Sequence, residues 1–166
     1  MRGNFLMPRL CLIGVTIMAI VSTFAATIRA SAQSKETPQV PSPEQVRFDQ
    51  VRGRLEAEYK SLDGKGYRRE ALEIVAAVGK GGMGFQLELV LGKSYAIVGA
   101  CDEACKKLEL VVHDSAGAVV TQSAETGGII VVAGTAGESG LHYGMLQVAE
   151  CGDDQCQVGL SVLRKD

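Results

Sequence analysis

The sequence lacks the short motifs that mark several common enzyme sites. No nucleophile elbow G-x-S-x-G occurs, so the usual signature of an α/β-hydrolase is missing. No C-x-x-C pair occurs, which argues against a redox-active dithiol of the thioredoxin type. The glycine-rich stretch at residues 79–84 is not followed by Lys and Ser or Thr at the spacing of a phosphate-binding loop. We therefore predict that the protein is not an enzyme and needs no cofactor.

Basic residues are scarce relative to acidic ones. The chain has 17 Lys and Arg against 19 Asp and Glu, a formal net charge of −2. The first 32 residues hold three of the arginines and no acid, so the rest has 14 basic residues, 19 acidic residues and a net charge of −5. An acidic domain without a basic stripe is a poor match to nucleic acid, where neutralised phosphates supply most of the affinity.

Residues 1–32 have the three parts of a secretory signal peptide. Arg2 and Arg9 precede an apolar run at residues 10–21, and small residues end in Ala30-Ser31-Ala32. The run is too short for a membrane span of about 20 residues. We predict cleavage after Ala32 and a periplasmic or secreted protein with no membrane span. An uncleaved N-terminal anchor is the alternative.

A flexible tether at residues 33–41, with two prolines, is predicted to lead into a helix at residues 42–64. Ser42 suits the cap, Pro43 suits the first turn and Gln45 suits a capping box, while Gly64 tolerates the positive φ of a helix end. Apolar residues recur at steps of three and four, which predicts one buried face. That face packs on its own domain or binds a partner. Its residues are Phe48, Val51, Leu55, Tyr59 and Leu62.

Residues 67–166 are predicted to form the β domain. Residues 67–78 carry both helix and strand signals, and we favour an extended segment. Glycines at residues 79–84 predict a flexible loop. About seven short strands with closely spaced turns then follow, typical of an all-β sandwich. The connections are too short for helical crossovers. The strands are expected near residues 85–91, 95–100, 108–113, 118–121, 129–132, 141–148 and 157–163.

Four cysteines lie outside the predicted signal, as two close pairs in polar loops. Spacings this short favour disulfides within each pair in an exported protein, although four cysteines allow three pairings. A zinc site made from all four thiolates is the main alternative. The favoured pairs are Cys101 with Cys105 and Cys151 with Cys156.

Several motifs occur together in the second half of the chain: Phe85-x-Leu87-x-Leu89, Gly92-x-x-Tyr95-Ala96-Ile97-Val98-Gly99-x-Cys101-Asp102, Leu108-x-Leu110, Asp114-x-x-Gly117 and a Gly-rich entry to Tyr143. Together they resemble the bacterial pre-peptidase C-terminal type of domain, most closely small exported relatives in which two loops each hold a cysteine pair. The resemblance covers roughly residues 80–164. It implies a jelly-roll-like β sandwich that serves as an accessory or binding module without catalysis of its own.

Some relatives carry further aspartates around the first cysteine loop that suit calcium. Here Lys106 and Lys107 stand where a cation would need oxygen ligands, which argues against calcium. The sequence therefore predicts no metal site.

His113 and His142 are the obvious catalytic candidates, and a Ser-His-Asp site would use Ser115 or Ser139 with Asp114. Because both histidines fall in or beside predicted strands, packed or surface roles are favoured.

We predict an antiparallel β sandwich with one N-terminal helix that binds an unknown protein or glycan. Rigid, disulfide-closed loops lose less entropy on binding, so the acidic residues beside the cysteines are the expected polar part of the surface. The alternatives are a small periplasmic hydrolase, or an assembly subunit that docks through the helix. The predicted binding-loop residues are Asp102, Glu103, Asp153 and Asp154.

Overall fold

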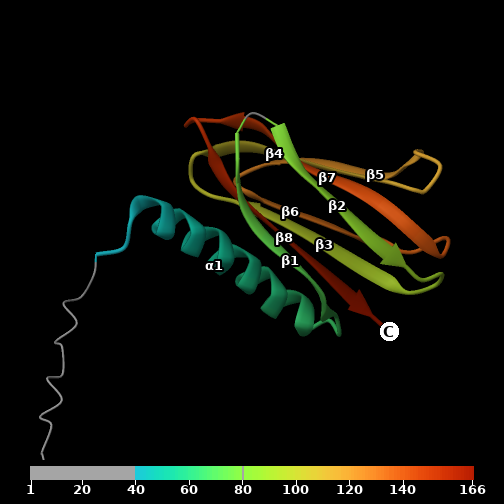
Figure 1. Cartoon of the computed structure of the whole chain (residues 1–166). Coiled ribbons are helices and arrows are strands. Elements are labelled where there is room, and N and C mark those ends of the chain that lie inside the picture. The colour runs from blue at the N-terminus through green and yellow to red at the C-terminus, as the bar shows by residue number, and fades with distance from the viewer. Residues whose placement is uncertain (1–39, 80) are drawn as a thin grey trace, which may run out of the picture. The chain divides into compact units, whose positions relative to one another are not determined.

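The computed structural model of the chain describes residues 40–79 and 81–166 (Figure 1). The predicted signal peptide and most of the predicted tether lie outside these residues. In the described part, one helix precedes eight strands. They are α1 (Pro43–Asp63), β1 (Arg68–Val78), β2 (Gly81–Leu89), β3 (Ser94–Cys101), β4 (Cys105–His113), β5 (Val119–Thr126), β6 (Ile129–Thr135), β7 (Gly140–Cys151) and β8 (Cys156–Lys165).

The strands form two four-stranded antiparallel sheets. Sheet A has the order β1-β8-β3-β6, and sheet B has the order β2-β7-β4-β5. These are the strand orders of an eight-stranded jelly roll. Only the β4–β5 connection stays within one sheet. Each of the remaining connections between consecutive strands passes from one sheet to the other. The predicted jelly-roll-like β sandwich with one helix is confirmed.

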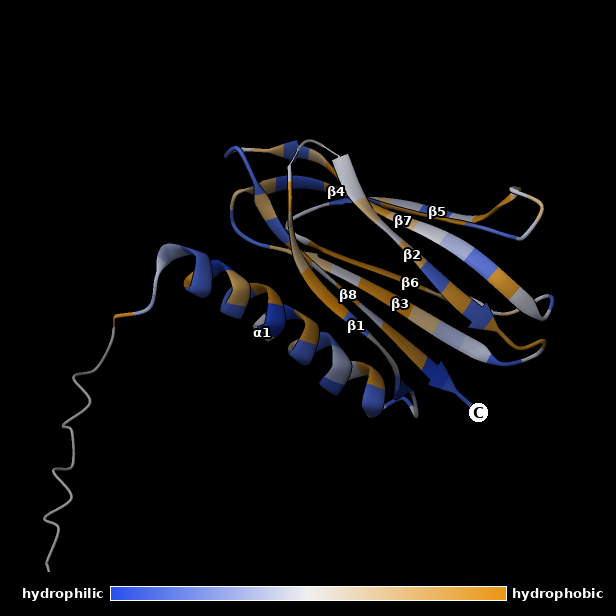
Figure 2. Ribbon diagram, viewed as in Figure 1, coloured by the Kyte–Doolittle hydropathy of each residue, from blue (hydrophilic) through white to orange (hydrophobic). Residues whose placement is uncertain are grey.

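The central strands of sheet A are covered on both faces, and this explains why they are apolar almost throughout. The inner face of the sheet meets sheet B in the main core, while its outer face meets α1 in a second, smaller core. β3 and β8 are buried along nearly their whole lengths. A strand that is buried on both faces reads as a continuous apolar run rather than an alternation. Figure 2 shows this contrast between the central strands and α1, which has apolar residues only at intervals.

The helix packs on its own domain, as the favoured interpretation of its apolar face predicts. Val51, Leu55 and Leu62 are buried against sheet A, and Tyr59 packs at the margin of the same cluster. Because these side chains already contact β3 and β8, the face is occupied within the chain itself. Docking of another subunit on that face would require the helix to leave the sheet.

Both ends of α1 differ in detail from the prediction. Ser42 caps the helix, since its Oγ accepts a hydrogen bond from the backbone N–H of Gln45 at 3.1 Å. The Gln45 side chain does not complete the predicted capping box, because its Nε2 donates to Asp49 at 3.0 Å instead. At the other end Gly64 keeps a helical φ of −60°, and the positive φ of 89° falls at Gly66. The backbone therefore adopts the positive φ that precedes β1 at Gly66, two residues later than the predicted Gly64.

Strand β1 confirms the extended segment that we favoured for residues 67–78. The flexible glycine loop predicted at residues 79–84 is wrong over most of its length, because β2 begins at Gly81 and includes Gly82 and Gly84. Backbone pairing explains the difference. β2 pairs with β7 in unbroken register from Gly81 opposite Val148 to Leu89 opposite Gly140. Here the hydrogen-bonded neighbour outweighs the low strand propensity of glycine.

Candidate functional site

The two cysteine loops lie at the same end of the sandwich, and each closes a disulfide within its own pair. Cys101 ends β3 and bonds Cys105 at the start of β4, while Cys151 ends β7 and bonds Cys156 at the start of β8. The favoured local pairing is therefore confirmed. Bridged sulfurs are not thiolates, so this state of the protein does not offer the four-cysteine zinc site.

Both bridges also join one sheet to the other. β3 and β8 belong to sheet A, whereas β4 and β7 belong to sheet B. Within sheet B, Cys105 is the ladder partner of Cys151, which makes the two bridges neighbours. A disulfide that closes a loop of about five residues stabilises a fold by about 2 kcal/mol in the chain-entropy model. The two bonds thus hold one end of the sandwich together.

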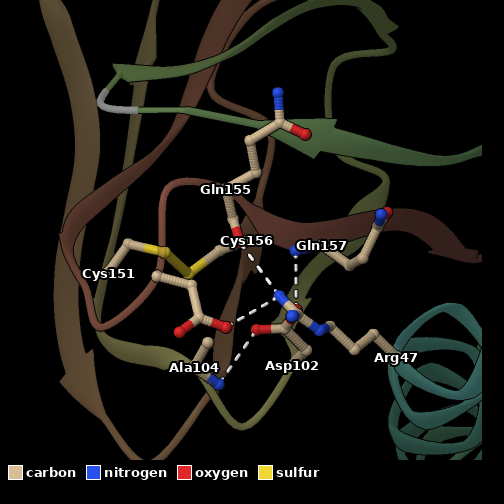
Figure 3. A network of polar contacts seen from close by, with 8 residues as sticks. Arg47, Asp102, Ala104, Cys151, Gln155, Cys156 and Gln157 are labelled. Carbon is tan, nitrogen blue, oxygen red and sulfur yellow. Dashed lines mark hydrogen bonds and ion pairs between the residues drawn. A yellow bond between two sulfur atoms is a disulfide. The ribbon is translucent and has the colours of Figure 1, made fainter. Parts of the chain in front are cut away.

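Asp102 does not belong to the exposed surface that we predicted for it. Its relative exposure is 0%. One carboxylate oxygen accepts from the backbone N–H of Ala104 at 3.1 Å, and the other accepts from that of Gln157 at 2.9 Å. The Asp102 N–H in turn donates to the Gln157 carbonyl at 3.0 Å. Asp102 therefore extends the β3–β8 pairing beyond Cys101 and joins the two cysteine loops (Figure 3).

The other three predicted residues, Glu103, Asp153 and Asp154, are exposed on the same two loops. Glu103 accepts a hydrogen bond from Gln50 Nε2 at 3.1 Å, and Asp153 forms an ion pair with Arg47 at 3.0 Å. We name these three residues the acidic rim. The structure brings them to one end of the molecule, next to the start of α1.

Helix α1 contributes side chains to this end that the sequence analysis missed. Arg47 donates to the Gln155 carbonyl at 3.2 Å in addition to its ion pair, and Figure 3 shows it reaching from the helix toward the second cysteine loop. Arg54 donates to the Cys101 carbonyl at 2.6 Å. Arg47, Gln50 and Arg54 recur at steps of three and four on the polar side of the helix. That spacing predicts that the three side chains share one face of the helix. No pattern in the neighbouring sequence identifies the loops that this face contacts.

An open polar depression lies between the start of α1 and the second cysteine loop, with a volume of about 1120 Å³. Arg47 and Asp153 form part of its lining, together with Glu44, Asp154 and the amide side chain of Gln155. A second depression of about 440 Å³ adjoins it and takes in Glu103 and Lys106. The acidic rim therefore borders two neighbouring hollows with hydrogen-bonding groups. Such a surface suits a polar partner rather than an apolar one.

The candidate catalytic residues are held in other contacts. His113 is the ladder partner of Tyr143, so His142, the next residue along β7, points to the opposite face of sheet B. His113 Nδ1 bonds the Gly117 carbonyl at 3.2 Å, and Ser139 Oγ accepts from the backbone N–H of Leu91 at 2.8 Å. The Asp114 carboxylate accepts from two backbone N–H groups of the β4–β5 turn. These contacts do not assemble a Ser-His-Asp arrangement from the predicted residues.

No three His, Cys, Asp or Glu side chains of residues 40–79 and 81–166 gather closely enough to hold a metal ion. Lys107, one of the two lysines that argued against calcium, forms an ion pair with Glu109.

Two disulfides are typical of a protein that folds in an oxidising compartment outside the cytoplasm. Over the same described stretch of chain, no helix is both long and apolar enough to cross a membrane. Comparison with protein-family models gives no match, and a search of curated proteins finds no significantly similar sequence.

Proposed function

We propose that the protein is an exported, non-catalytic binding or accessory module of the bacterial cell envelope or the extracellular space. Its partner is a protein or a glycan, recognised by the end of the sandwich that the two disulfides brace. The single observation that carries the proposal is the convergence of both cysteine loops and α1 on the acidic rim. A braced loop loses little conformational entropy when it binds, so more of the contact energy remains for affinity.

The resemblance of residues 80–164 to the pre-peptidase C-terminal type of domain supports the same proposal, because such domains are accessory modules. The predicted signal peptide supports export to the periplasm or beyond. Export is tested by expressing the full chain in a bacterial host and fractionating the cells. We expect a chain that begins at Gln33 outside the cytoplasm, with all four remaining cysteines oxidised. A full-length chain with free thiols in the cytoplasm would contradict the proposal.

The binding surface is tested by placing a photo-crosslinking amino acid at Asp154 and, as a control, at Gly53. Both positions are exposed, and a Cβ at Gly53 meets no atom within 4 Å. We expect Asp154 to yield a specific crosslinked product in the periplasm or medium that the control position does not give. The partner identified in that product is then titrated with the purified protein and with a Glu103→Gln/Asp153→Asn/Asp154→Asn variant. At least a tenfold loss of affinity is expected, whereas unchanged affinity would exclude the acidic rim.

A further inference from the structure

A further hollow, separate from the two at the braced end, lies between the sheets at the end away from the disulfides. It has a volume of about 490 Å³, within the range of small-molecule sites. Both sheets line it, since Ile97 and Val132 come from sheet A while Leu89 and Val112 come from sheet B. Its lining is mainly apolar, as in most sites that enclose a small organic molecule. We name this hollow the inter-sheet cleft.

Besides the Tyr95 phenol, the lining includes two carboxyl groups and an imidazole, those of Asp114, Glu138 and His142. No lysine or arginine is among the residues of the described chain that line the cleft. The polar side of the cleft therefore carries carboxylates without a cation of its own.

The contacts of His142 show which ring nitrogen donates a hydrogen bond and which one accepts. The ring is almost fully buried, at 2% exposure, and its Nδ1 lies 3.1 Å from the Gly140 carbonyl. A carbonyl only accepts, so Nδ1 must carry the proton of that bond. In the neutral ring Nε2 is then an acceptor, and it lies 3.8 Å from a carboxylate oxygen of Glu138. In this tautomer two acceptors lie side by side, and a donor placed between them can bond both.

We propose that the inter-sheet cleft binds a small molecule with an apolar chain and a primary ammonium group. An ammonium has three N–H donors, so it can donate to His142 Nε2 and to the Glu138 carboxylate together. Its chain then occupies the space between Ile97, Val132 and Val112. A carboxylate or phosphate head would instead meet Asp114 and Glu138 with like charge. This site is separate from the acidic rim, and its occupancy does not depend on the partner proposed there.

The probe is n-octylamine, titrated into the purified protein at neutral pH and followed by calorimetry and by amide shifts in NMR spectra. n-Octanoate, 1-octanol and n-hexylamine serve as comparisons. We expect saturable binding of octylamine, with shifts at lining residues of β3, β4 and β6. Octanoate should bind at least tenfold more weakly. Each buried methylene is worth roughly fourfold in affinity, so hexylamine, which is two methylenes shorter, should bind about fifteenfold more weakly than octylamine.

Two variants locate the site. Gly134 lines the cleft and is the ladder partner of Tyr95, so a side chain there points to the inner face, where a Cβ meets no atom within 4 Å. Gly134→Val should fill the cleft and weaken octylamine binding at least tenfold. Gly84→Val is the matched control, because Gly84 is also a strand glycine with open space around its Cβ and does not line the cleft. It should leave binding unchanged.

Glu138→Gln separates recognition of the ammonium from binding of the chain. It should reduce octylamine affinity at least fivefold while leaving 1-octanol affinity unchanged. Absence of octylamine binding, equal binding of octylamine and octanoate, or equal loss in Gly134→Val and Gly84→Val would each overturn the proposal.

Discussion

Cys105 and Cys151 are ladder partners in the β4–β7 pair, although each forms its disulfide with a different cysteine. Cα atoms of directly opposed residues in an antiparallel pair lie about 4.5–5.5 Å apart, within the range that a disulfide spans. We therefore predict that a Cys101→Ser/Cys156→Ser variant, refolded under oxidising conditions, forms a new Cys105–Cys151 bond. Peptide mapping by mass spectrometry without reduction identifies that bond directly.

The control for this experiment is Cys101→Ser/Cys105→Ser, which keeps Cys151 and Cys156 together and should retain their bond. Recovery of the first variant with two free thiols, while the control is fully oxidised, would contradict the neighbouring placement of the bridges. The control should also unfold at a lower urea concentration than the wild type, with a loss of about 2 kcal/mol for the missing bridge.

Replacement of Asp102 should weaken the fold rather than partner binding alone. Asp102→Ala removes the acceptor for two backbone N–H groups, those of Ala104 and Gln157. Each buried donor left without a partner costs about 1–3 kcal/mol, so we expect a total loss of about 3 kcal/mol in urea denaturation. Asp154→Ala is the control, because its exposed carboxylate should change the free energy of unfolding by less than about 0.5 kcal/mol. Equal effects of the two variants would show that the Asp102 contacts contribute little.

Asp102 also shows where sequence reasoning reached its limit. An aspartate next to a cysteine in a polar loop reads as a solvated turn residue. The residue that fixes its position instead is Gln157, 55 positions away, and no local pattern reports that contact. The same limit applies to Gly82 and Gly84. Their strand is set by pairing with β7, while their own propensity favours a loop.

Features with a local cause were predicted well. The Ser42 cap depends on a contact three residues away, and the disulfide loops close within four or five residues. The strand expected near residues 157–163 lies within β8, and its residues Val158, Leu160 and Val162 belong to the main core. Which sheet α1 would cover, and which loops Arg47 would reach, depended on the jelly-roll topology. The three residues of the acidic rim were therefore predictable, whereas the helix residues Arg47 and Gln50 that contact the rim were not.

Close packing between α1 and β8 gives a third prediction. A Cβ on Gly159 would lie 2.7 Å from Cγ1 of Val51 and 2.8 Å from Cδ1 of Leu55. Gly159→Ala should therefore push the helix away from sheet A and destabilise the protein by about 1–3 kcal/mol, the usual cost of overpacking. Thermal unfolding of the variant measures the loss.

A Val51→Ala/Gly159→Ala double variant tests whether contact with the helix causes that loss. It removes the methyl group closest to the added Cβ, so the double variant should be more stable than the sum of the single losses predicts. Gly84→Ala, at an open position of β2, is the control and should cost less than Gly159→Ala. Strictly additive losses would mean that Gly159 is needed for some reason other than contact with the helix.

The contact between Arg69 of β1 and Glu56 of α1 should stabilise the fold less as the pH becomes acidic. Arg69 of β1 donates to Glu56 of α1 at 2.8 Å and lies over the ring of Tyr59, with 4.2 Å from the guanidinium carbon to the ring centroid. The hydrogen bond from Arg69 holds the pKa of Glu56 below its ordinary value. A lowered pKa in the folded state means that the pairing stabilises the fold above the ordinary glutamate pKa. This stabilisation is lost as the pH falls through the lowered value.

Glu56→Gln should therefore lower the free energy of unfolding at pH 7, and the difference from wild type should shrink as the pH falls below the ordinary glutamate pKa and through the lowered one. The difference is small because Glu56 is on the surface, so it is best measured by urea denaturation at a series of pH values. In an Arg69→Gln background the effect of Glu56→Gln should be much smaller, since the main cause of the lowered pKa is gone and only the charges of Lys60 and Arg52 still lower it. A pH-independent effect of Glu56→Gln, present with and without Arg69, would assign the loss to helix propensity instead of the ion pair.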